Sequence, residues 1–166
     1  MRLVNRGSSG NAGNAVEGAL MGTLLRLESI SPNLAGTYRE ANDDQRRRAA
    51  LVLCSTAVAQ VGLQGSEVDA AFAVLRHERR EQSDIHQMLD RLAAQLDEEY
   101  FKLSDEAETT TSEALLTFRK ARAAAALAFA LSPDAGQLHE AVYEAIVASS
   151  NRAEAVRVAE TVLRTK

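Results

Sequence analysis

The sequence predicts an all-α protein, an antiparallel bundle of five or six helices with one long helical hairpin at about residues 33–61 and 66–103. Three observations predict this class. The chain is rich in Ala, the strongest helix former, but has only nine Gly and two Pro in 166 residues. No Gly occurs between Ser66 and Ala135, which is foreign to β-sandwiches and barrels. No short segment alternates like a half-buried strand between turn signals.

Length and composition favour a single soluble domain. Hydrophobic residues make up 46% of the chain and charged residues 25%, as in ordinary globular proteins, and a chain of this length can bury a full core. Residues 1–13 are rich in Gly, Ser and Asn and lack helical periodicity, so we interpret them as a flexible N-terminal arm. Residues 14–166 then form one helical domain.

The first two helices are predicted from their caps and apolar spacing. Asn14 is a good N-cap residue, and apolar side chains recur every three or four residues from there to Ile30, which is the pattern of one buried helical face. Ser31-Pro32 then begins the second helix, because Ser caps a helix and Pro fits its first position. This helix is predicted to run to about Val61.

The remaining helices follow a Gly-containing turn at residues 62–65. Ser66 caps the third helix, whose apolar residues keep alternating three- and four-residue spacing to about Leu103, with or without a break near residues 76–84. Capping patterns predict three further helices, at residues 110–131, 133–149 and 151–166.

The two long helices share a polar zone. Residues 42–48 and residues 76–84 contain no hydrophobic side chain, and they lie at similar distances from the turn at Gln64. If the helices fold back on each other there, residue 46 lands near residue 82. We call these two segments together the polar waist. Their opposite charges could then pair: Arg46, Arg47 and Arg48 with Glu78, Glu81 and Asp84, and Asp43 and Asp44 with Arg79 and Arg80.

The leading functional hypothesis is a module that binds another protein or a second copy of itself through the polar waist. Arg forms bidentate hydrogen bonds and is enriched in protein interfaces. The simpler interpretation is a solvated stretch of ion pairs, each worth about 0.2–1 kcal/mol. The candidate partner-binding residues are Arg46, Arg47, Arg48, Arg76, Arg79, Arg80 and Glu81.

The rival hypothesis is a ligand- or metal-binding bundle, which could include an enzyme, with a pocket at the waist. His77 with Glu81 and His86 with Asp90 are each four residues apart, so each pair shares a helix face. However, none of the three His follows a Glu at the Glu-x-x-His spacing of di-iron bundles, and no His-Glu-x-x-His zinc pattern occurs. No metal ligand set, cofactor or catalytic residue is therefore predicted.

Charge and hydropathy exclude other classes. The Arg-rich segment 39–48 has a net charge of only +1, unlike a nucleic-acid-binding face. The longest apolar run, residues 123–131, is nine residues, whereas a membrane span needs about 20. The first ten residues contain no apolar leader. We therefore expect a cytoplasmic protein that binds neither nucleic acid nor membrane.

Three smaller features complete the predictions. Cys54 lies in an apolar run, so we expect a buried, unreactive thiol. His139, near the start of the fifth helix, is predicted at the surface. Residues 95–108 carry a net charge of −5; they are most simply a solvated face, and alternatively they attract a basic partner.

Overall fold

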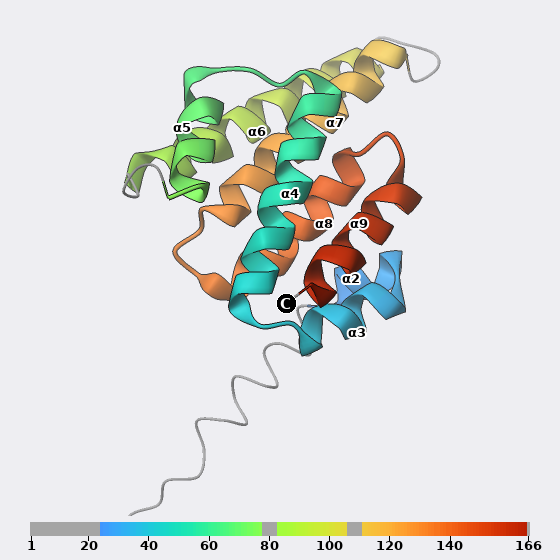
Figure 1. Ribbon diagram of the computed structural model, residues 1–166. Helices are drawn as coiled ribbons and strands as arrows, with labels where there is room; N and C mark the ends of the chain where they lie inside the picture. Colours follow the sequence, from blue (N-terminus) through green and yellow to red (C-terminus); the bar gives the residue numbers. More distant parts are fainter. Residues whose placement is uncertain (1–23, 78–82, 106–110, 166) are drawn as a thin grey trace, which may run out of the picture.

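The computed structural model describes residues 24–77, 83–105 and 111–165 (Figure 1). These residues contain eight α-helices and no strand. The all-α bundle is confirmed, with more helices than the five or six predicted. The predicted arm at residues 1–13 lies outside the described residues. The helices are α2 (Leu25–Ile30), α3 (Pro32–Glu40), α4 (Asp43–Val61), α5 (Ser66–Leu75), α6 (Ser83–Asp105), α7 (Ser112–Ala130), α8 (Leu138–Ala148) and α9 (Arg152–Arg164).

The predicted helix at residues 33–61 is two helices. Ser31 caps α3 as predicted, because its hydroxyl accepts from the Leu34 N–H. The single-helix prediction is wrong at Asn42, whose side chain accepts from the Gln45 N–H, while the Gln45 side chain accepts from the Asn42 N–H. This reciprocal capping box starts α4 anew, so the polar segment 42–48 forms the first turns of a helix.

The predicted long hairpin is shorter than expected. Gly62 takes a left-handed conformation with φ of 63°, which ends α4, and α5 then doubles back along it. The helix ends at Leu75, however, and His77 also has a positive φ of 60°. The predicted helix 66–103 is therefore two helices, and the long hairpin of the structure is α6 with α7 (Figure 1).

The C-terminal helices begin where side chains supply a cap. Thr111 caps α7 and Asn151 caps α9, each accepting from a backbone N–H three residues later. The prediction that a helix starts at Pro133 is wrong. The Ser132 hydroxyl accepts from the Asp134 N–H, and the Asp134 carboxylate accepts from the Gly136 N–H. These local bonds form a turn that competes with the helix, and a 3-10 helix, Ala135–Gln137, precedes α8.

Helix α7 lies at the centre of the bundle. Its second half is buried between α4, α6 and α8, and most of the side chains there are Ala, which lets helix axes approach closely. α8 packs on α4 and α7, and α9 covers α3 and α4. No described helix is both long enough and apolar enough to cross a membrane.

Candidate functional site

The Arg residues at the start of α4 contact neighbouring backbone. Arg46 donates from Nε to the Tyr38 carbonyl and from Nη2 to the Arg39 carbonyl, both at 3.0 Å. Arg48 donates to the Thr165 carbonyl at 2.8 Å. These bonds connect the start of α4 to the ends of α3 and α9. Arg47 is exposed.

The second half of the polar waist is described only in part. The predicted contact residues Arg79, Arg80 and Glu81 lie outside the described residues, as does Glu78. Arg76 is exposed at the end of α5, and its guanidinium carbon lies 5.4 Å from the centroid of the Phe72 ring.

The residues of the alternative pocket do not form a metal site in the described ranges. His77 is exposed, and Glu81 lies outside those ranges. The His86 ring lies 2.9 Å from the Ala128 carbonyl through Nδ1 and 3.4 Å from Asp90 through Nε2. Within residues 24–77, 83–105 and 111–165, no three His, Cys, Asp or Glu side chains gather as metal ligands. His86 therefore acts as a link between α6 and α7.

An ionic cluster around the buried Glu144 joins four helices, and the sequence reasoning missed it. Glu144 of α8 has a side chain only 2% exposed. One of its oxygens accepts from Arg26 of α2 at 2.8 Å and the other from Arg122 of α7 at 3.3 Å. Arg122 also pairs with Asp97 of α6, and Arg26 with Glu140 at 2.6 Å. The carboxylates of this cluster are occupied by guanidinium groups, so it ties the helices together.

The electrostatics of Arg26 show how tightly this cluster is coupled. Burial alone would lower the pKa of its guanidinium, but the charges of Glu144 and Glu140 outweigh burial and raise that pKa. The Tyr143 ring lies 3.9 Å from the guanidinium carbon, a cation–π distance.

His139 is buried, so the prediction of a surface residue is wrong. Its side chain is 2% exposed and packs edge-on against the Tyr38 ring, with 6.4 Å between ring centroids. His139, Val142 and Ile146 share one face of α8 by their three- and four-residue spacing, and all three are buried. That spacing could have indicated burial from the sequence.

The distal half of the α6–α7 hairpin carries an uncovered apolar surface. Phe101 is 61% exposed, Leu115 43% and Leu116 42%. The Tyr100 ring contacts those of Phe101 and Phe118, with centroids 5.4 and 5.3 Å away. We call this surface the hairpin patch: Tyr100, Phe101, Leu115, Leu116 and Phe118.

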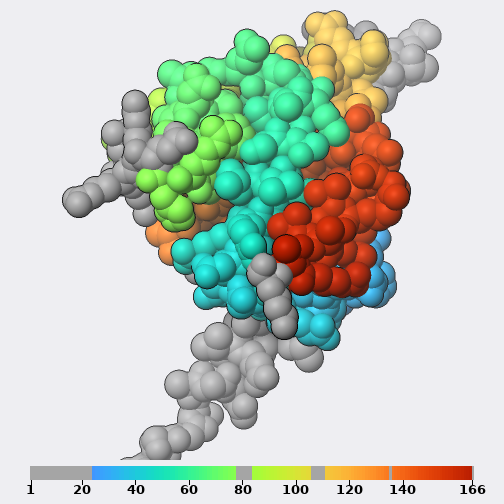
Figure 2. All heavy atoms as spheres, viewed as in Figure 1, coloured from blue at the N-terminus to red at the C-terminus, as the bar shows by residue number. Residues whose placement is uncertain are grey.

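The hairpin patch lies at the edge of the molecule. In Figure 2 the first turns of α7, in gold, stand beyond the orange and red surface of α8 and α9. Exposed acids border the patch on α6, namely Glu98, Glu99 and Asp105. The sequence offered one signal for it, since three of the seven aromatic residues fall between positions 100 and 118.

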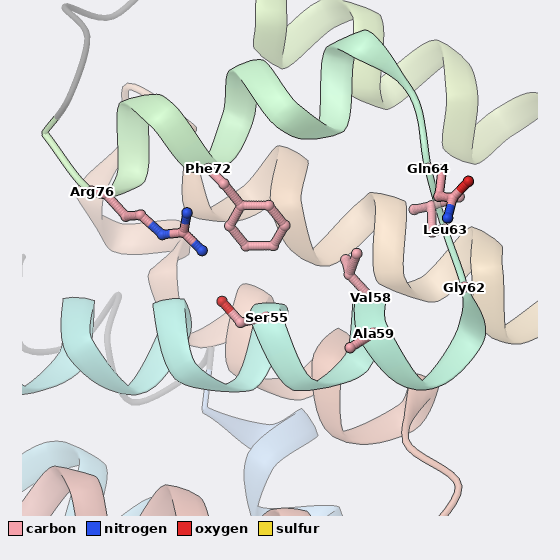
Figure 3. Close-up of a pocket in the computed structure, with 8 residues that line it drawn as sticks. All are labelled: Ser55, Val58, Ala59, Gly62, Leu63, Gln64, Phe72 and Arg76. Carbon is pink, nitrogen blue, oxygen red and sulfur yellow. The ribbon is translucent and has the colours of Figure 1, made fainter.

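A second surface feature is the hollow between α4 and α5. It has a volume of about 290 Å³. Figure 3 shows Ser55 and Val58 rising from α4, and Phe72 and Arg76 descending from α5. We call it the α4–α5 hollow.

Cys54 is buried, and burial raises the pKa of its thiol to about 12. The thiolate is the reactive form. At pH of about 8 we therefore expect Cys54 of the folded chain to react with a disulfide reagent about 100-fold more slowly, or more, than in the urea-unfolded chain. A stopped-flow absorbance measurement of both states tests this, and equal rates would contradict the burial.

The features that distinguish this chain are thus an ionic cluster, an exposed aromatic patch and a shallow hollow. No protein-family model, curated protein or solved structure matches the sequence or the fold. Of the three features, the ionic cluster has its carboxylates paired within the chain, whereas the hairpin patch and the α4–α5 hollow present exposed side chains.

Proposed function

We propose that the chain is a protein-binding module, that the hairpin patch is its contact surface, and that its partner presents apolar side chains flanked by Lys and Arg. The hairpin patch replaces the polar waist as the contact surface because Arg46 and Arg48 already bind backbone carbonyls.

The observation that carries this proposal is the exposure of Phe101, whose ring contacts the partly buried ring of Tyr100. Aromatic side chains are enriched at the cores of protein interfaces and supply much of their binding energy. Phe101 is held against Tyr100, and Tyr100 against Phe118, so the patch is pre-ordered and loses little side-chain entropy on binding.

Charge decides between a basic partner and a second copy of the chain. Among residues 98–105 of α6, Glu98, Glu99 and Asp105 are exposed acids, whereas Lys102 is the one exposed cation, so the described surface beside the patch is acidic. A symmetric dimer through two such patches would bring like charges together, which costs free energy. A partner with Lys and Arg around an apolar side chain complements both the apolar surface of the patch and the acidic side chains beside it.

Two designed peptides test the proposal by fluorescence anisotropy. Each is an amphipathic helix with Leu and Phe on one face, and the opposite face carries Lys and Arg in one peptide and Glu in the other. We expect the basic peptide to bind with an affinity that falls as salt rises from about 50 to about 300 mM. Equal affinity for the acidic peptide would overturn the proposed partner chemistry.

Two matched variants test whether the basic peptide binds at the hairpin patch. Phe101→Ser is expected to weaken binding of the basic peptide by about tenfold or more. Leu25→Ser is the control, because Leu25 is 62% exposed but lies on α2, and it is expected to leave the affinity unchanged. An unchanged affinity in Phe101→Ser would contradict the proposal. So would a dimer, seen by light scattering, that Phe101→Ser dissociates, since that result assigns the patch to a second copy.

A further inference from the structure

The α4–α5 hollow has an apolar floor, with a cation and a hydroxyl at one of its two ends. Val58 and Leu63 are buried and Phe72 is partly buried, and the Phe72 ring points into the gap between the helices (Figure 3). Arg76 and Ser55 lie at one end, whereas the other end is formed by the chain reversal at Gly62. A mostly apolar hollow with few polar groups is typical of small-molecule sites.

The cation at one end of the hollow is Arg76, which is exposed. Within the described residues, Arg76 forms no ion pair with a carboxylate, and its contact is the face of the Phe72 ring. Figure 3 shows its guanidinium extending over the hollow toward α4, on the side of Ser55. A guanidinium above an apolar surface binds a carboxylate through charge-assisted hydrogen bonds.

We propose that the α4–α5 hollow binds a small carboxylate with an unbranched apolar body, such as a medium-chain fatty acid. The carboxylate contacts Arg76 and Ser55, and the apolar body lies along Phe72 and Val58 toward Leu63. The volume of about 290 Å³ lies just below the usual range of ligand pockets, about 300–1,000 Å³, so the site favours a small ligand over a lipid with two chains. This site is separate from the hairpin patch and does not depend on the proposed function.

Three probes with the same apolar tail test the proposal: octanoate, octanol and octylammonium. Each is titrated into the ¹⁵N-labelled full chain, and amide chemical shifts are recorded. We expect saturable shifts at Gly62, Leu63 and Phe72, and an affinity for octanoate about tenfold higher than for octanol, the effect of one hydrogen bond to a charged group. Octylammonium is expected to bind least tightly, because it places a second cation beside Arg76.

Arg76→Gln is expected to abolish the preference for octanoate while leaving the affinity for octanol unchanged. Arg47→Gln is the matched control, because it also removes an exposed Arg, and it should preserve the preference. Ser55→Leu fills the hollow and should abolish binding of octanoate and octanol. The proposal is overturned if octanoate causes no saturable shift, if its shifts fall on the hairpin patch, or if Arg76→Gln leaves the preference intact.

Discussion

Replacing Glu144 by Gln is expected to lower the free energy of unfolding by about 2–4 kcal/mol. Glu144 is almost completely buried and each of its oxygens accepts from a different guanidinium. Breaking a buried ion pair by removing one partner typically costs about 3–5 kcal/mol, and the partial exposure of Arg26 and Arg122 reduces this figure. The amide of Gln would also direct N–H groups at one guanidinium, where no acceptor is present.

This loss is measured by urea unfolding, monitored by circular dichroism. Two control variants show whether the loss comes from the buried charge. Glu154→Gln removes an exposed carboxylate paired with Arg157 and should change stability by less than about 1 kcal/mol. The double variant Glu144→Leu with Arg122→Met removes both charges of one buried pair and should recover most of the stability. If Glu144→Gln lowered the free energy of unfolding no more than Glu154→Gln, the ion pairs of Glu144 would not stabilise the packing of the helices.

The ionic cluster also shows what sequence reasoning could not reach. Arg26 and Glu144 are 118 positions apart, and neither residue belongs to a charged run. Local patterns predicted the caps at Ser31 and Asn151, because a cap depends on residues within one turn. The partners of a buried charge depend on which helices become neighbours, and a single sequence does not specify this.

The polar waist also depended on tertiary arrangement, and residues 78–82 of it lie outside the described part of the chain. The reversal at Gly62 was predicted, and α5 does return along α4. The pairing of residues 42–48 with residues 76–84 further required a helix through each segment. Residues 43–48 do lie in α4, but α5 ends at Leu75, before the second segment. Each polar segment thus begins at a helix end, at the N-cap Asn42 and at the C-cap Arg76.

The hairpin patch was hidden by the same limitation. The regular apolar spacing of residues 85–103 correctly indicated an amphipathic helix, but spacing alone does not say which part of that helix other helices cover. In the structure α6 and α7 extend past α8 and α9 (Figure 1), and the distal residues Phe101, Leu115 and Leu116 are exposed. Exposure of Phe101 therefore follows from the relative lengths of helices, which depend on tertiary packing.

Leu89→Ala is expected to destabilise the fold by about 3–5 kcal/mol, and Leu92→Ala by only about half as much. Both residues lie on the apolar spacing of α6 and are one turn apart, so the sequence predicts equal burial. The structure separates them, because Leu89 is 0% exposed whereas Leu92 is only partly buried at the edge of the core. Truncating Leu89 removes packed atoms and leaves a cavity enclosed by neighbours that cannot collapse into it.

At Leu92 solvent and mobile side chains can fill the space, so the cavity contribution is small and mainly the transfer free energy of the removed atoms is lost. Urea unfolding of both variants measures the difference, which should appear as a shift of the midpoint at unchanged slope. An equal loss in the two variants would mean that another molecule or a second copy of the chain covers α6 near Leu92 in solution. The interface proposed at the hairpin patch would then extend along α6 to Leu92.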